Sequence, residues 1–196
     1  MKKHLLLSSK VAMLCVSFVF TALLSYAQPT GTDDDGFTVR IVTPSSIAKD
    51  IPNGFQNCGW VGTADFGPDV TEDMCGDVVW ALPDSLGCAP LPAGSLDGKI
   101  ALIRRGTCGF SLKIYHAQQA GAKAAIILNH YNNPQDGPCE AYANATQFFG
   151  GMSGLDSASA VTIPAIFLQR QTGEDIDGAL AAGEKVEVCF IFPRMA

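Results

Sequence analysis

Two histidines, His116 and His130, are the only candidates for a catalytic base beyond the first 27 residues. A serine or cysteine nucleophile needs such a base, but the chain contains neither a Gly-x-Ser-x-Gly nor a His-Glu-x-x-His motif. His116 falls within a predicted helix, and we expect it on the helix surface. His130 follows a predicted strand, where ligands often gather in α/β sheets, and we expect it to be solvated or to contribute a polar contact to a binding rim. The sequence therefore predicts no catalytic centre.

Cysteines are the second group that could do chemistry. An even number of cysteines in an exported chain indicates disulfide bonds, and six cysteines allow 15 full pairings. No Cys-x-x-Cys motif occurs, and with only two histidines a zinc site is poorly supported. We therefore expect structural disulfides and no metal or cofactor among the six cysteines that follow residue 27: Cys58, Cys75, Cys88, Cys108, Cys139 and Cys189.

Polar side chains directly follow two apolar runs of the second half. Arg104 and Arg105 come after the first run, and Asn129, His130 and Tyr131 come after the second. An arginine pair suits a carboxylate or a peptide terminus, although salt bridges to an acidic surface would use the same side chains. These five residues are the candidate binding residues of the chain.

The first 27 residues resemble a secretory signal peptide. Lys2, Lys3 and His4 form a basic start, residues 11–24 are mostly apolar, and Ser25 and Ala27 supply the small residues of a cleavage site. The apolar run is short for a membrane span of about 20 residues. We therefore expect a secreted or periplasmic protein with no membrane anchor after cleavage.

Charge restricts the partners of the mature chain. Removal of 27 residues from 196 leaves 169, enough for one domain, and lowers Lys+Arg from 13 to 10 against 19 acidic residues, for a net charge of about −9. This acidity argues against nucleic acid, whose binding needs a basic face. Residues 28–36 are polar and turn-forming, so a flexible lead-in is expected there. The Asp33–Asp35 run lacks the closing Glu of a calcium loop.

Hydrophobic periodicity then predicts the elements that position these residues. Apolar runs and period-2 alternation indicate strands, and apolar residues at helical spacing indicate helices. Within 110–120, Ser111 is a candidate N-cap and Gly121 a left-handed stop. The strand, helix and strand over 99–128 form a βαβ unit, so we expect a mixed α/β domain. The predicted strands cover 37–42, 77–82, 99–103, 124–128, 161–168 and 185–191, and the predicted helices cover 110–120 and 171–182.

Two long stretches resemble the protease-associated (PA) domain family. The first is Gly98-Lys-Ile-Ala-Leu-Ile-Arg-Arg-Gly-Thr-Cys-Gly-Phe110, followed by Lys113, the Ala117–Ala122 stretch and Ala125–Asn129. The second is the closing section from Ile163 to Gly183. The resemblance implies a swivelling β/β/α fold over residues 37–192, a disulfide-stapled mixed β-sandwich or barrel with flanking helices, followed by a short tail at 193–196.

The resemblance also implies a cysteine pairing and a role. A cysteine before the first core strand pairs with the cysteine after Arg-Gly-x in many members, which implies a Cys88–Cys108 disulfide here. The pairing of the other four cysteines stays open, with Cys58–Cys75 and Cys139–Cys189 as the pairs that we expect. Family members are non-catalytic modules that bind peptides or proteins, or regulate substrate access to a peptidase. We therefore expect a peptide or protein ligand, with a secreted peptidase as one candidate partner. The alternative is an accessory fragment or subunit of a secreted subtilase or metallopeptidase.

Overall fold

The computed structural model describes residues 38–52, 61–129, 151–168 and 170–192. Within these ranges the chain forms strands, two α-helices and one short 3-10 helix. In chain order they are β1 (Thr38–Thr43), β2 (Lys49–Pro52), β3 (Val61–Ala64), β4 (Met74–Trp80), β5 (Ile100–Arg104), α1 (Phe110–Gln119), β6 (Ala124–Leu128), β7 (Gly151–Met152), η1 (Ala158–Ala160), β8 (Ala165–Leu168), α3 (Arg170–Ala181) and β9 (Glu187–Ile191).

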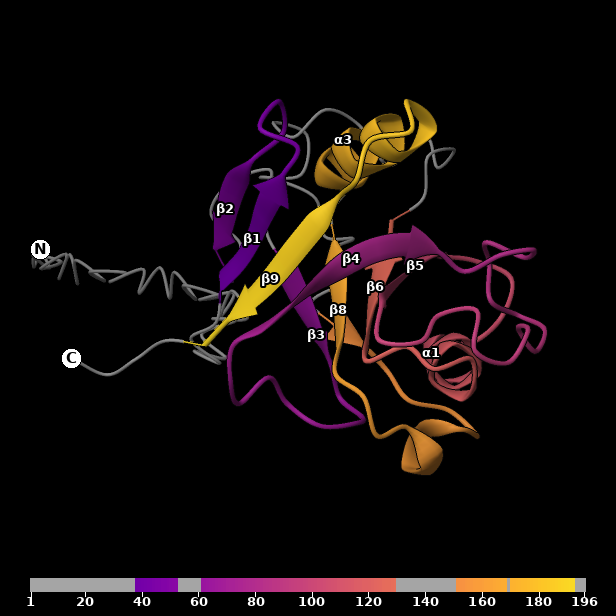
Figure 1. Cartoon of the computed structure of the whole chain (residues 1–196). Coiled ribbons are helices and arrows are strands. Elements are labelled where there is room, and N and C mark those ends of the chain that lie inside the picture. Colours follow the sequence, from indigo (N-terminus) through magenta and orange to yellow (C-terminus); the bar gives the residue numbers. More distant parts are fainter. Residues whose placement is uncertain (1–37, 53–60, 130–150, 169, 193–196) are drawn as a thin grey trace, which may run out of the picture. The chain divides into compact units, whose positions relative to one another are not determined.

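Strand β4 connects the two parts of a mixed sheet whose order is β2-β1-β9-β4-β5-β6-β8-β3-β7. Its first half, from Met74 to Asp77, pairs antiparallel with β9, and its second half, from Val78 to Trp80, pairs parallel with β5. Figure 1 shows β4 running between these two neighbours. Strands β5, β6 and β8 are parallel, and α1 makes the crossover from β5 to β6. The βαβ unit expected over 99–128 is confirmed.

Alternation along the parallel strands separates two cores, because successive side chains point to opposite faces of a sheet. One face packs with α3 in what we call the α3-side core, which includes Ile100, Leu102, Ala124, Ile126, Leu128, Ile166, Leu168, Ile176 and Ala179. The other face packs with α1 in the α1-side core, which includes Ala101, Ile103, Ile114, Ala117, Ala120, Ala125, Ile127, Ala165 and Phe167. The two helices therefore cover opposite faces of the parallel strands.

Strands β1, β2 and β9 close over the α3-side core. Val39 and Ile41 of β1, Ile51 of β2 and Val188 and Phe190 of β9 are all buried in it, together with the residues of β5, β6 and β8. The exposed Arg40 and Val42 alternate with the buried residues of β1. Apolar side chains of two packed sheet parts thus share one core, as in a β-sandwich, and the expected α/β fold with flanking helices is confirmed.

Most predicted elements lie within a few residues of the observed ones. The predicted strand 124–128 coincides with β6, and the predicted helices end one residue away from the ends of α1 and α3. The predicted strand 161–168 was too long, since β8 begins only at Ala165. Pro164 has no N–H to donate to a ladder, although its carbonyl oxygen accepts a bond from the amide of Ala125 at 3.1 Å.

Two short strands within residues 44–92 were missed by the sequence analysis, which expected only 77–82 to be extended there, and the two-residue strand β7 was missed as well. Strand β2 contains Lys, Asp and Pro, and β3 contains Gly, all of which have low strand propensity. Each pairs antiparallel with a stronger strand, β2 with β1 and β3 with β8. The long-range pairing, rather than local preference, makes these segments extended.

The expected N-cap of α1 is wrong, because Gly109 and not Ser111 occupies that position. Ser111 is fully buried in the first turn, where its hydroxyl oxygen accepts a hydrogen bond from the amide of Leu155 at 3.0 Å. The hydroxyl therefore satisfies a distant loop amide, not the first turn of its own helix. The stop at Gly121 is confirmed, with a φ of 96°.

Replacing Gly121 with alanine should destabilise the protein much more than the same change at Gly183. Both residues have left-handed φ values, 96° and 78°, so both changes cost about 1 kcal/mol of backbone strain. A Cβ at Gly121 would also lie 1.9 Å from Asp97 Oδ1 and 3.0 Å from Asp97 Cα, whereas one at Gly183 meets nothing within 4 Å. Overpacking should add about 2 kcal/mol to the loss of stability at Gly121. Urea denaturation of Gly121→Ala and Gly183→Ala measures the two losses. Equal losses would contradict this reasoning.

Candidate functional site

The carboxyl ends of the parallel strands bring two of the predicted binding residues together. The amide of Arg105 donates to the carbonyl oxygen of Leu128 at 2.8 Å, and the amide of Asn129 donates to that of Leu168 at 3.1 Å. The ladder thus extends one residue beyond β5 and β6. Ligands of open α/β sheets bind outside this edge, so its geometry is suited to a binding site.

The Arg105 side chain is fixed at this edge by contacts on the α1 side of the sheet. Its Nη1 donates to Asn129 Oδ1 at 2.9 Å, and its guanidinium lies 5.9 Å from the ring centroid of Phe167. Phe167 is buried and packs edge-to-face against Phe110, with ring centroids 6.1 Å apart. The result is a half-buried cation oriented by an amide and supported by aromatic rings.

Arg104 has different neighbours, on the α3 side of the sheet. Its Nη2 lies 3.0 Å from Asp177 Oδ2 on α3, and its guanidinium stacks 4.4 Å from the Trp80 ring. This is the salt bridge that the sequence offered as the alternative to a binding role. Adjacent residues of a strand point to opposite faces, so the two arginines contact different cores. The other two candidate residues, His130 and Tyr131, lie outside the described part of the chain.

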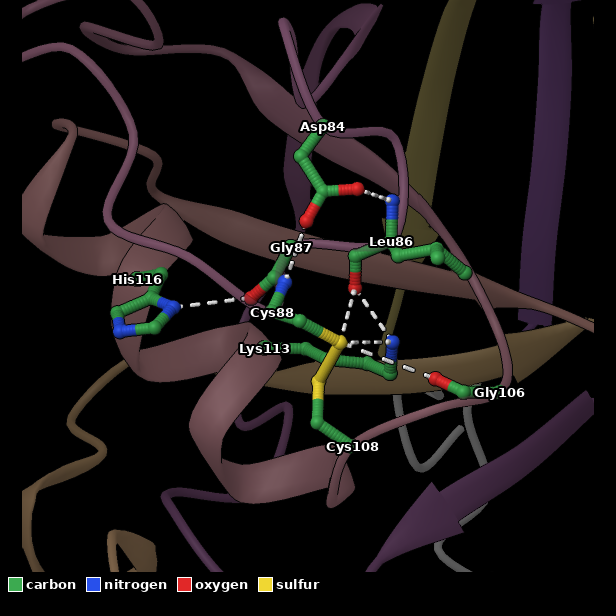
Figure 2. The surroundings of a disulfide bond; sticks show 8 residues. All are labelled: Asp84, Leu86, Gly87, Cys88, Gly106, Cys108, Lys113 and His116. Carbon is green, nitrogen blue, oxygen red and sulfur yellow. Dashed lines mark hydrogen bonds between the residues drawn. A yellow bond between two sulfur atoms is a disulfide. The ribbon is translucent and has the colours of Figure 1, made fainter.

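A disulfide ties the loop that carries Arg105 to the turn after β4 (Figure 2). Cys88 and Cys108 are bonded, with their Cα atoms 5.7 Å apart, and the pairing implied by the family resemblance is confirmed. The turn is organised by Asp84, whose carboxylate accepts hydrogen bonds from the amides of Leu86 at 3.0 Å and Cys88 at 2.9 Å. Burial alone would raise the pKa of Asp84, but these amides and the Lys113 ammonium outweigh it and lower the pKa.

Lys113, near the candidate site, is a buried charged residue to which the sequence analysis assigned no role. Its side chain is 0% exposed. The ammonium donates to the carbonyl oxygen of Leu86 and lies 3.6 Å from Cys88 Sγ. Burial lowers the pKa of Lys113 to about 8, an effect that the charge of Asp84 only partly opposes. A signal existed in the sequence, because Lys113 lies three residues after Phe110 and four before Ala117, on the apolar side of the helix.

His116 is not on the helix surface, so that expectation was wrong. It is 9% exposed, and its Nδ1 lies 2.9 Å from the carbonyl oxygen of Gly87 (Figure 2). His116 follows Lys113 by three residues, which places both on one side of α1. The turn around Gly87 covers that side, which the periodicity of the helix alone could not reveal.

The second disulfide corrects the remaining pairings. Cys75 is bonded to Cys189, which excludes both Cys58–Cys75 and Cys139–Cys189. The two residues are direct partners in the antiparallel pairing of β4 with β9, with Cα atoms 3.9 Å apart. Their distance along the chain, 114 residues, hid this proximity from the sequence. Cys58 and Cys139 lie outside the described residues.

The described ranges contain neither a cluster of metal ligands nor a candidate membrane span. There, no three or more His, Cys, Asp or Glu side chains lie close enough together to hold a metal ion. No helix in the same ranges is both long and apolar enough to cross a membrane. The acidic run Asp33–Asp35 is outside them.

The relatives found by comparison with known proteins include a signal peptide peptidase-like protein and a vacuolar-sorting receptor. The chain is 32% identical over 139 residues to signal peptide peptidase-like 5 of Oryza sativa subsp. japonica, covering 69% of this chain and 23% of that protein. It is 27% identical over 158 residues to vacuolar-sorting receptor 1 of Pisum sativum, covering 76% of this chain and 24% of the receptor. The chain thus spans about a quarter of the length of these relatives.

A solved structure and a family model are also similar to this chain. An aminopeptidase from Aneurinibacillus sp. strain AM-1 is similar with a TM-score of 0.50 and 25% sequence identity, covering 79% of this chain and 30% of the aminopeptidase. The family model described as the PA domain matches residues 74–176, which include β4 to β8, both arginines, Lys113 and the Cys88–Cys108 bond. This chain belongs to the PA domain family.

Proposed function

We propose that this chain is a secreted or periplasmic, non-catalytic PA module that binds a peptide or protein ligand through a carboxylate group. The observation that carries the proposal is the Arg105–Asn129 pair at the carboxyl edge of β5 and β6. A guanidinium has five N–H donors in a fixed fork, so one side chain can hold a positioning bond and also pair with a carboxylate. The neighbouring His130 and Tyr131 are proposed to extend the same rim.

The environment of His116 supports the non-catalytic part of the proposal. A general base must reach the proton that it removes, whereas His116 is buried and its Nδ1 faces a backbone carbonyl oxygen. We expect the purified protein not to cleave casein or generic peptide substrates. Turnover that persists through purification and is lost in His130→Ala would overturn this part.

Arg105→Ala should weaken ligand binding by about 10- to 100-fold, because a charge-assisted hydrogen bond contributes about 1.5–3 kcal/mol. The probe is a peptide selected from a display library with free C-termini, redesigned so that its C-terminus is its only carboxylate. Fluorescence anisotropy measures its affinity for the wild type and for the variant. The amidated form of the same peptide should bind the wild type as weakly as the free peptide binds Arg105→Ala.

Arg40→Ala is the matched control for that experiment. Arg40 lies on β1, where it pairs with Asp50 at 2.6 Å and half of its side chain is exposed. This change removes the same charge from the protein but leaves the carboxyl edge intact, so affinity should stay within about twofold of the wild type. Equal losses in the two variants would indicate only a general charge effect and would contradict the site.

A second candidate is an accessory role in a secreted peptidase. The likeness to the aminopeptidase favours it, since this chain is similar to 30% of a protein that is named as a peptidase. In that case the chain should co-elute with a peptidase from the native secretome. It should change the kcat/KM of that peptidase for protein substrates but leave its kcat/KM for a dipeptide unchanged. A peptidase whose kinetics are the same with and without the chain would contradict this role.

A further inference from the structure

The two sulfur atoms of the Cys88–Cys108 bond have different surroundings. Cys88 Sγ lies 3.6 Å from the buried Lys113 ammonium, and the Cys88 amide is held by Asp84 (Figure 2). Cys108 is half-buried in the β5–α1 loop, directly after the exposed Thr107. Cys88 is half-buried as well, so the difference between the two sulfur atoms is the ammonium that lies beside Cys88 Sγ.

Thiol–disulfide exchange is sensitive to this difference. An external thiolate attacks one sulfur of a disulfide and expels the other as a thiolate, and the reaction is faster when the departing thiol has the lower pKa. A nearby ammonium lowers the pKa of a thiol. The position of Lys113 therefore favours departure of Cys88 over departure of Cys108.

We propose that Cys108 is a site of mixed-disulfide formation, at which an external thiolate attacks Cys108 Sγ and Cys88 leaves as a thiolate paired with Lys113. In this step the Cys88–Cys108 bond breaks, a bond forms between the external sulfur and Cys108, and Cys88 takes both electrons of the broken bond. A second external thiol then attacks the mixed disulfide. The external thiols are oxidised to their own disulfide, and both cysteines are left reduced.

The electrostatics of the buried lysine support this direction of attack. Burial lowers the pKa of Lys113 to about 8, which still leaves the side chain mainly protonated at neutral pH. Among the described residues, the charge that acts on the Lys113 ammonium is that of Asp84, whose two carboxylate oxygens already accept hydrogen bonds from backbone amides. His116 of the same helix faces the Gly87 carbonyl oxygen. A thiolate at Cys88 gives the ammonium an anionic partner in contact, so the folded environment stabilises the reduced form.

Opening this bond has a consequence for the candidate binding site. The bond joins the turn after β4 to the loop that begins with Arg105. Its reduction removes a constraint on that loop and should weaken binding there. This consequence rests on the proposed function, whereas the exchange reaction does not. If no ligand binds at Arg105, the exchange reaction can therefore still be tested.

The test is the position of the first adduct on the oxidised protein. The purified chain is treated briefly with reduced glutathione, quenched with acid, and alkylated with N-ethylmaleimide. Trypsin cleaves after Arg105 and after Lys113, which separates Cys108 from the peptide that carries Cys88. Early adducts on Cys108 should exceed those on Cys88 on the order of tenfold. Equal amounts of early adduct on the two cysteines, or an excess on Cys88, would overturn the proposal. This result is decisive by itself and does not depend on the variants described next.

Lys113→Met tests the cause of this preference. Methionine keeps much of the apolar length but removes the charge, so the ratio of adducts should fall toward one and exchange should slow on the order of tenfold. Lys123→Met is the control, since Lys123 donates to the carbonyl oxygen of Cys75 and not to a sulfur. Its adduct ratio should equal that of the wild type. A folded Lys113→Met protein with an unchanged ratio would overturn the role of Lys113.

Discussion

Replacing Cys75 and Cys189 together with alanine should lower the free energy of unfolding by about 5 kcal/mol. The bond closes a segment with a sequence separation of 114, and loss of such a cross-link releases chain entropy in the unfolded state that grows with the length of the loop. The bond also joins β4 to β9, through which the β2-β1-β9 part is attached to the parallel strands. Guanidinium denaturation followed by circular dichroism measures the loss.

The matched comparison is the double replacement of Cys88 and Cys108. Their separation is only 20 residues, for which the same relation gives about 3 kcal/mol. The decisive result is which of the two double variants loses more free energy of unfolding. A larger loss for the Cys88–Cys108 pair would mean that contacts of the turn around Asp84 and Lys113, and not chain entropy, dominate.

Raising the pH from 8 to 10.5 should stabilise the wild-type protein relative to Lys113→Met by up to about 3 kcal/mol. The pKa of Lys113 is lowered by burial from 10.5 to about 8 in the folded state. Between these values the unfolded chain binds more protons than the folded one, so the free energy of unfolding rises with pH. Urea denaturation at several pH values, on both proteins, gives the difference.

Lys185→Met is the control for this pH dependence. Lys185 is exposed, and its pKa is raised by a hydrogen bond to Asp77 rather than lowered. The free energy of unfolding of Lys185→Met should therefore still rise between pH 8 and 10.5, as it does in the wild type. If Lys113→Met shows the same rise as the wild type, then the buried side chain is not the group that titrates there.

Much of the fold could be predicted from the sequence because the strongest patterns are local. The apolar run at 124–128 is buried on both faces as β6, and alternation at Val186, Val188 and Phe190 marks the buried face of β9. The family signature over β5 and α1 also located the Cys88–Cys108 bond and the strand ends that carry Arg105 and Asn129. Each of these inferences uses residues within one short segment.

Long-range contacts limited what could be predicted about the candidate site. The sequence placed Arg104 and Arg105 side by side, but the sheet directs one toward Asp177 on α3 and the other toward Asn129 after β6. It also treated His116 as a surface residue, because a helical pattern does not show which loop will cover the helix. In both cases the neighbours come from other elements of the fold.

The sequence by itself determined the βαβ unit and the positions at which polar residues end the parallel strands, because propensity and periodicity act within a few residues. The family was identified by the resemblance of two long stretches of the sequence to the PA domain. Only the tertiary structure decided the Cys75–Cys189 bond and the burial of Lys113 beside Cys88. Both depend on segments that approach each other through strand pairing and helix packing. The burial of Lys113 also has the largest effect on chemistry. It lowers the pKa of the side chain and places the ammonium beside the sulfur atom of Cys88.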